Sequence, residues 1–135
     1  MLAKLRKSHS RSASVMDVIE RGCNDIMHEH GVGHTEAFYE KALSHYLYEK
    51  CIPFLTQVDC FVQKGSAQIN VGRIDMEVSH NIILEFKVGT SVKPQDLHQL
   101  QKYIRARKAC GIDISNAAVI CFRTDGSVEV NKFTF

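Results

Sequence analysis

The segment RIDMEVSHNIILEFK, residues 73–87, predicts two strands joined by a tight turn. Its first half alternates apolar Ile74, Met76 and Val78 with charged residues, which is the period of a strand with one buried face. The second half, from Ile82 onward, begins apolar on both faces, as a central strand does. Ser, His and Asn at 79–81 have the chemistry of a turn. The segment therefore predicts an antiparallel hairpin inside a sheet.

The length of this turn decides which side chains meet. With a three-residue turn, position 78 faces 82, 76 faces 84, and Asp75 faces Glu85, with Lys87 one pleat further along the same face. Facing carboxylates repel each other, so a divalent cation is expected to offset the cost. A two-residue turn would place Glu85 on the other face of the sheet. Glu77 shares the polar face but lies nearer the turn, and we expect it to be solvated.

The rest of the chain predicts a mixed α/β domain. Helical periodicity covers 15–30 and 36–50, and Pro94 is placed to open a third helix that Gly111 ends. Strand patterns cover 54–63, 117–122 and 128–135. Three consecutive strands then form an antiparallel meander, and the strand after the third helix returns beside it in a sheet flanked by helices. We expect residues 14–135 to form one domain, preceded by a flexible, basic and serine-rich arm over 1–13.

The composition is that of an ordinary globular domain. Its 17 basic and 15 acidic residues give a net charge of +2, so any nucleic-acid surface must come from local clustering. Five widely spaced cysteines without a Cys-x-x-Cys pair argue against a zinc ribbon or a disulfide scaffold and predict buried free thiols. No apolar run is long enough to span a bilayer and no secretory signal is present, so we expect an intracellular protein, cytoplasmic or nuclear.

The segment GHTEAFY, residues 33–39, resembles the signature of the GxxExxY protein family, a branch of the PD-(D/E)XK nuclease superfamily. The resemblance continues through YEKAL (39–43), Asp75, LEFK (84–87) and HQLQKY (98–103), and it covers about 15–122. Ile74 stands where the superfamily name has proline, and AAVICF at 117–122 only roughly matches the family's Gly-Leu-Leu-Ile-Asn-Phe strand. The resemblance implies a restriction-endonuclease-like fold and a Mg²⁺- or Mn²⁺-dependent nuclease, with DNA a more probable substrate than RNA.

The resemblance also implies residue roles, and the chemistry of the side chains agrees with them. Asp75 and Glu85 are expected to bind the metal together with the backbone carbonyl of Phe86, with Glu36 completing the shell directly or through water. Lys87 is expected to hold or deprotonate a water and to stabilise developing charge. Gln99 is expected to orient Lys87 or a phosphate. The alternatives are a plain charged strand face for the acids and polar packing of the helix for Gln99.

The third predicted helix carries a basic run that includes Arg107. The residues expected to contact nucleic acid are Lys93, Lys102, Arg105, Lys108 and Tyr103; a solvated helix face explains the charges equally well. The rival to an enzyme is a non-catalytic module that binds nucleic acid or protein and keeps the nuclease fold. No membrane contact is expected, whereas a homodimer or a protein partner is possible.

Overall fold

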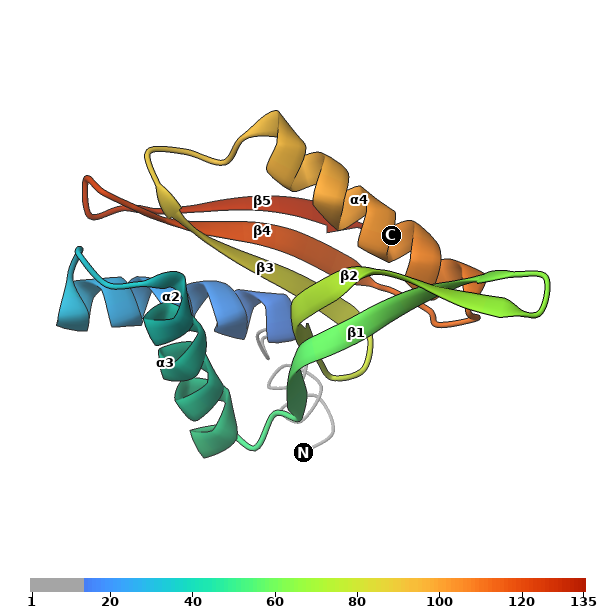
Figure 1. Cartoon of the computed structure of the whole chain (residues 1–135). Coiled ribbons are helices and arrows are strands. Elements are labelled where there is room, and N and C mark those ends of the chain that lie inside the picture. Colours follow the sequence, from blue (N-terminus) through green and yellow to red (C-terminus); the bar gives the residue numbers. More distant parts are fainter. Residues whose placement is uncertain (1–13) are drawn as a thin grey trace, which may run out of the picture.

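A computed structural model describes residues 14–135, so the expected N-terminal arm, residues 1–13, lies outside the described part of the chain. The elements, in order, are α2 (Val15–His30), α3 (Glu36–Glu49), β1 (Phe54–Lys64), β2 (Ala67–Val78), β3 (Ile82–Gly89), α4 (Pro94–Ala109), β4 (Asn116–Arg123) and β5 (Val128–Thr134). The strands form one sheet in the order β1-β2-β3-β4-β5. Only β3 and β4 run parallel, and α4 crosses between them (Figure 1). The predicted meander with a returning strand is confirmed.

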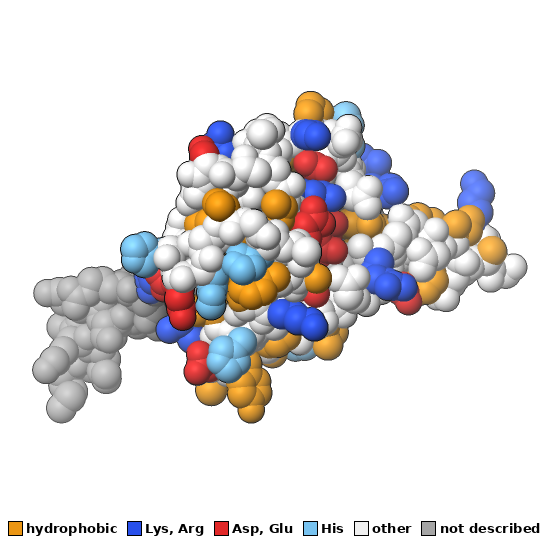
Figure 2. Space-filling view, turned by 60° about the vertical axis from the view of Figure 1, so that its left-hand side comes forward, with side chains coloured by type: hydrophobic (Ala, Val, Ile, Leu, Met, Phe, Trp, Pro, Cys, Tyr) orange, Lys and Arg blue, Asp and Glu red, His pale blue; other side chains and the backbone are white. Residues whose placement is uncertain are grey.

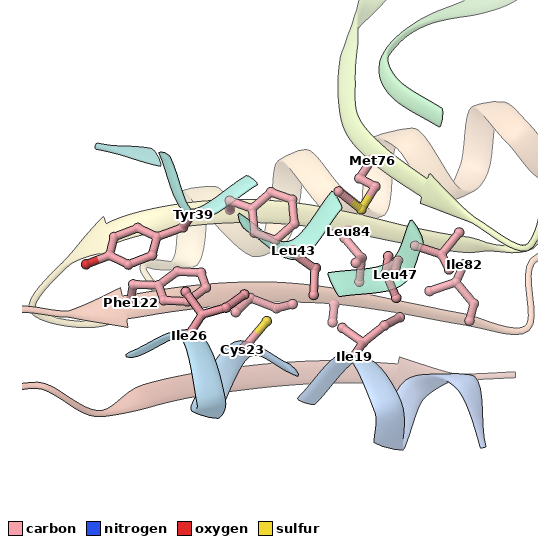
Figure 3. Close-up of a cluster of buried hydrophobic side chains, with 14 of the residues drawn as sticks. Ile19, Cys23, Ile26, Tyr39, Leu43, Leu47, Met76, Ile82, Leu84 and Phe122 are labelled. Carbon is pink, nitrogen blue, oxygen red and sulfur yellow. The ribbon is translucent and has the colours of Figure 1, made fainter. Parts of the chain in front are cut away.

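Helices cover both faces of the sheet. Helices α2 and α3 lie on one side and α4 on the other (Figure 1). The first core joins the α2 and α3 side chains to alternate residues of β2, β3 and β4, and Figure 3 shows its centre around Leu43, Leu84 and Phe122. The second core joins Leu100, Tyr103 and other α4 residues to the opposite face. Because β3 is sandwiched between both cores, its apolar residues run consecutively rather than alternately.

The helix boundaries follow the capping residues. Ser14 and Asp17 form a reciprocal capping box at the start of α2. Gly31, with a φ of +73°, ends that helix. The Thr35 hydroxyl accepts the Phe38 N–H and starts α3. None of the helices within residues 14–135 is long and apolar enough to cross a membrane.

The central turn has three residues, and its predicted register is confirmed where the ladder exists. Val78 pairs with Ile82, and Met76 pairs with Leu84. The ladder then stops, so the direct pairing of Asp75 with Glu85 is not formed. Beyond this point β3 stays paired with β4, while β2 stays paired with β1. The two strands therefore diverge after the Met76–Leu84 pair, and Asp75 and Glu85 lie at the point of divergence.

The predicted sharing of one face by Ile74, Met76 and Val78 is wrong for Ile74. Met76 and Val78 pack in the core beneath α2 and α3, but Ile74 packs in the core beneath α4. The change of face falls at Asp75. Opposite it, Gln57 of β1 has a φ of +54°, and the β1–β2 pairing skips both residues. A left-handed residue breaks the alternation of its own strand, and β2 changes face at the same skipped pair as β1.

Glu77 corrects a second expectation, because it is buried rather than solvated. It pairs across the sheet with Ile83, whose side chain faces α4, and it is only 5% exposed. Arg107 of α4 meets it in a two-point contact: Nε lies 2.8 Å from Oε2, and Nη2 donates to Oε1 at 2.8 Å. Arg107 is therefore not part of the exposed basic surface of α4. We call Glu77 and Arg107 the buried ion pair.

The cysteines are all free, as expected, but not all are buried. Cys23, Cys60 and Cys121 are buried, whereas Cys51 and Cys110 are exposed. Both exposed thiols lie within two residues of the end of a helix, where the chain leaves the packed layers.

Candidate active site

The separation of β2 and β3 leaves backbone groups that two carboxylates satisfy. The Asp75 N–H donates to Glu85 Oε2 at 2.8 Å, and the Phe86 N–H donates to Asp75 Oδ2 at 2.9 Å. Each acid therefore bonds the main chain at the other's strand, which holds the two carboxylates together in the gap. We call Asp75 and Glu85 the acidic pair.

The acidic pair is held in an unfavourable charge environment. Burial raises the pKa of Glu85 to about 8, and the charge of Asp75 adds to the rise. Burial also raises the pKa of Asp75, reinforced by Glu36, while the Phe86 N–H and Lys87 act in the opposite direction. Desolvation and a like charge both disfavour ionisation. The site thus holds more negative charge than its own cations balance.

Lys87 lies beside the acidic pair, one pleat along β3 from Glu85. Its Nζ is 3.9 Å from Oδ1 of Asp96, and its side chain is partly exposed. The other oxygen of Asp96 accepts the Lys93 N–H at 2.9 Å and so fixes the first turn of α4. Lys87 therefore stands between the acidic pair and Asp96, a residue that the sequence analysis did not single out.

Glu36 reaches the site from α3. Its Oε2 accepts the Val88 N–H at 3.3 Å, just past the Lys87 position on β3. Together with Asp75 it lines a cavity of about 210 Å³, whose walls are Glu36, Ala37, Glu40, Gln57, Asp75 and Phe86. The helix start that the sequence predicted thus delivers a carboxylate to the acidic pair.

Two further residues of this cavity were missed from the sequence. The Glu40 Oε1 accepts the Gln57 side-chain amide at 2.8 Å, and burial raises the pKa of Glu40, with a contribution from Asp75. Glu40 had a detectable signal, since it lies one helical turn after Glu36 and on the same face. Gln57 had none, because its position depends on its unusual backbone conformation.

Tyr39 fixes the part of α3 that carries Glu36. Its ring is buried and stacks on Phe122 with centroids 4.1 Å apart, and its hydroxyl donates to the Gly31 carbonyl at 2.7 Å. The tyrosine thereby ties the start of α3 both to the sheet and to the end of α2. Glu36, three residues earlier, is held at the exposed edge above the acidic pair.

Gln99 and Tyr103 approach from the other face. The Gln99 side-chain amide donates to the Tyr103 hydroxyl. The Tyr103 ring is only 1% exposed and packs against Gly72, where a Cβ would come within 2.5 Å of the hydroxyl. Burial raises the pKa of Tyr103, and the nearby Glu85 adds to it. The expected nucleic-acid contact at Tyr103 is not supported, because its ring is buried, and the exposed Gln99 is the member of the pair that faces solvent.

The other predicted nucleic-acid contacts lie on exposed positions of α4 and its start. Lys93, Lys102, Arg105 and Lys108 are all exposed. They do not form one cluster. Lys93 adjoins the acidic site through Asp96, whereas Lys108 lies at the far end of the helix with its Nζ 3.6 Å from the Phe135 ring centre. The helix thus carries spaced positive charges that lead away from the site.

The donor set of the acidic pair fits a hard divalent cation. Within residues 14–135, no group of three or more His, Cys, Asp and Glu side chains is arranged to hold a metal ion. Mg²⁺, however, is commonly held by one or two carboxylates, with waters and substrate phosphate completing its shell. The N–H and C=O of a strand residue point to the same side, so the Phe86 carbonyl also points into the gap. Two carboxylates and one carbonyl meet this requirement.

Comparison with known proteins assigns the chain to a family. The model of the PD-(D/E)XK nuclease superfamily matches residues 13–133, and the protein belongs to that superfamily. Its mixed sheet between helices is a restriction-endonuclease-like fold. None of the curated proteins compared with it matches. Among solved structures, the one titled "Crystal structure of SSO0001" is similar with a TM-score of 0.47 and 17% identity, over 98% of this chain and 74% of that one.

Proposed function

We propose that the protein is a Mg²⁺- or Mn²⁺-dependent nuclease that hydrolyses phosphodiester bonds, with DNA as its preferred substrate. The observation that carries the proposal is the acidic pair, two carboxylates locked to each other's strand beside a lysine. Membership of the superfamily supports it. We also propose, on the signature at 33–39, that the chain belongs to the GxxExxY branch.

The proposed roles follow from the contacts. Asp75, Glu85 and the Phe86 carbonyl hold the ion, and Glu36 contributes directly or through a water. A bound divalent ion supplies Lewis acidity toward the phosphate and lowers the pKa of water. Lys87 holds the attacking water and stabilises negative charge that develops on the phosphate. Gln99 is hydrogen-bonded to a fixed tyrosine and orients a phosphate or Lys87. Lys93, Lys102, Arg105 and Lys108 contact the nucleic-acid backbone.

The rival function is binding without cleavage, and a two-variant experiment separates the two. Mg²⁺ or Mn²⁺ is expected to raise the melting temperature of the wild type, because an ion that binds only the folded state stabilises it. Asp75→Asn removes that gain, since an amide is a poorer ligand for a hard cation. Lys87→Ala keeps the gain, because an ammonium group is not a ligand. Cleavage of a mixed DNA and RNA panel falls to a small residual rate in both variants.

The matched control is Asp113→Asn, which changes an exposed acid in the loop before β4 and should alter neither measurement. A flat melting temperature across the metal titration, with nucleic-acid binding retained by Asp75→Asn, would contradict the nuclease and favour the binding module.

A further inference from the structure

The outer half of the β1–β2 hairpin, residues 60–72, packs against α4 at its base, and its tip extends beyond the helices that cover the rest of the sheet (Figure 1). We call it the outer hairpin. Every residue from Gln63 to Asn70 is exposed. The sequence analysis predicted a strand over 54–63 but not the strand that returns from Ala67. A two-stranded ribbon without a covering layer gains little from its own packing, so its exposed faces call for a partner.

The register of the outer hairpin sorts its side chains into two different faces. Phe61 pairs with Asn70, and Gln63 pairs with Gln68. The alternate pairs, Val62–Ile69 and Lys64–Ala67, point the other way. Val62 packs against the core beneath α4, so the face with three amide side chains is the one that looks away from α4. We call it the amide face.

The amide face lies on the same side of the sheet as the acidic cavity. Gln57 lines that cavity and bonds Glu40 of α3. Next along the strands, Asp59 and Arg73 pair at 3.5 Å, and the amide face follows. Six residues of strand separate Gln57 from Gln63, a distance of ~20 Å. A continuous track thus runs from the acidic pair to the tip of the hairpin.

The charge of the outer hairpin suits a polyanion. The sequence has no Asp or Glu from Cys60 to Ile74. Lys64 stands at the tip, on the face opposite the amides, and Arg73 stands at the base, where it pairs with Asp59. Figure 2 shows the projection at the right of the molecule, with acidic side chains near its base and none further out on the visible face. Its surface therefore offers cations and neutral amides to a ligand, without the like charges that would repel phosphates.

The base of the outer hairpin is anchored, so it presents the amide face at a defined place. Tyr103 of α4 fills the space beside Gly72, whose φ of +143° and absent side chain permit that approach. The Cys110 thiol lies 3.8 Å from the Phe61 carbonyl. Ordered side chains at one end of a ribbon lower the entropy cost of binding at the other.

We infer that the outer hairpin enters the major groove of duplex DNA, where Gln63, Gln68 and Asn70 contact base edges while the acidic pair faces a backbone phosphate. This inference rests on the proposed nuclease function and adds the substrate form. The major groove of B-DNA admits a two-stranded ribbon, and the amide of Gln68 can match the donor and acceptor of adenine. The Gln63 amide donates to the Gly65 carbonyl and the Asn70 oxygen accepts the Gly72 N–H, so Gln63 offers mainly its oxygen and Asn70 its NH₂ to a base edge. The major groove of duplex RNA is too deep and narrow for such a ribbon. Single strands have no groove to fill.

Equilibrium binding in EDTA tests the inference without cleavage. The probes are a DNA duplex two helical turns long, the RNA duplex of the same sequence, and the DNA single strand, followed by fluorescence anisotropy. The wild type should bind the DNA duplex most tightly. The triple variant Gln63→Ala/Gln68→Ala/Asn70→Ala should bind it roughly tenfold more weakly or worse, because lost base-edge contacts each contribute about 1 kcal/mol or more. Its affinity for the single strand should not change.

Two further variants make the test specific. Lys64→Ala should lower the slope of log affinity against log salt by about 0.9, the value for one phosphate contact, whereas the amide variant should leave the slope unchanged. Gln101→Ala/Asn24→Ala, which removes exposed amides outside the hairpin, should bind as the wild type does. All three variants change exposed side chains, and an unaltered melting temperature confirms that they fold.

The inference is overturned if the triple variant binds duplex DNA normally, or if it loses affinity for all three probes equally. It is also overturned if the triple variant changes the oligomeric state in size-exclusion chromatography with light scattering, since the hairpin would then join copies of this chain. If cleavage depends on Asp75 but the hairpin variants have no effect, only the inference about the hairpin is refuted. If duplex binding depends on the hairpin but no cleavage occurs, the proposed nuclease function is refuted instead.

Discussion

Strand β2 carries two acids only two residues apart, the buried Glu77 and the half-buried Asp75, and their surroundings are built in opposite ways. Glu77 has its counter-charge inside the protein, where Arg107 meets both of its carboxylate oxygens. Asp75 has another carboxylate as its neighbour, and the closest cation, Lys87, is shared with Glu85 and Asp96. The sequence presents both residues as acids on one strand.

The difference indicates that Glu77 stabilises the fold, whereas Asp75 is placed to bind a ligand. A buried carboxylate costs free energy unless it is paired and hydrogen-bonded. The buried ion pair meets most of that condition between β2 and α4: Arg107 Nη2 donates to Glu77 Oε1, and Arg107 Nε lies 2.8 Å from Oε2 without a hydrogen bond. The acidic pair meets it only in part, through two main-chain N–H groups. Buried like charges without a full set of partners mark a functional site more often than a structural one.

The largest expected effect tests the structural half of this comparison. Glu77→Gln leaves the Arg107 guanidinium buried without a counter-charge, so the free energy of unfolding should fall by ~3 kcal/mol or more. Urea unfolding followed by circular dichroism measures it. Asp59→Asn is the control, because the Asp59–Arg73 pair is more than half exposed on both sides and its loss should cost ~0.5 kcal/mol at most. Equal stability of Glu77→Gln and wild type would show that this pair does not stabilise the fold.

The second effect tests the acidic pair through pH. Glu85 binds its proton more tightly in the folded chain, where its pKa is about 8, than in the unfolded chain, where the ordinary value is 4.5. The folded state therefore holds more protons between these values, and metal-free stability must fall as pH rises through that window. From pH 6 to pH 8 the loss is expected to reach ~2 kcal/mol, and Glu85→Gln should abolish it.

The variant and the wild type are compared by urea unfolding in EDTA at each pH, so other titrating groups cancel in the difference. Asp75→Asn sharpens the comparison. It removes the neighbouring charge that helps to raise the pKa of Glu85. The variant should therefore lose stability over a lower pH range than the wild type does. A Glu85→Gln protein that keeps the full pH dependence would show that another group causes it.

The local features of this fold were predictable, because neighbours in sequence decide them. The turn at 79–81, the helix caps at Ser14 and Thr35, and the crossover after β3 all follow from nearby residues. The same holds for the meeting of the Asp75 and Glu85 regions, which depends only on the length of the turn.

The errors have one physical origin, which is that partners came from distant elements. Glu77 was expected to be solvated because a half-buried strand has one wet face, yet α4 brings Arg107 from thirty residues away. Ile74 changes face where the β1–β2 pairing skips Asp75 and the left-handed Gln57 on another strand. The contact of Asp96 with Lys87 was missed because it depends on how α4 crosses the sheet after β3. No local pattern at these positions reports such contacts.

The smallest expected effect concerns Asp96, the acid that has one role in the fold and one at the site. One of its oxygens caps α4 at Lys93, and the other faces the Lys87 ammonium. Asn at this position still accepts the N–H, so the free energy of unfolding should barely change. It loses the charge that helps to hold Lys87 in its position between the acidic pair and α4.

Under the proposed function, Asp96→Asn should therefore lower kcat about fivefold, close to 1 kcal/mol, with KM unchanged. The decisive measurement is a double-mutant cycle with Lys87→Ala, read through the residual cleavage rate. If Asp96 acts by positioning Lys87, its substitution has no further effect once the lysine is gone, because the two changes remove the same interaction. A full fivefold loss in the Lys87→Ala background would mean that Asp96 acts on the helix or the substrate instead. Asp96 would then belong with Glu77 among the structural acids.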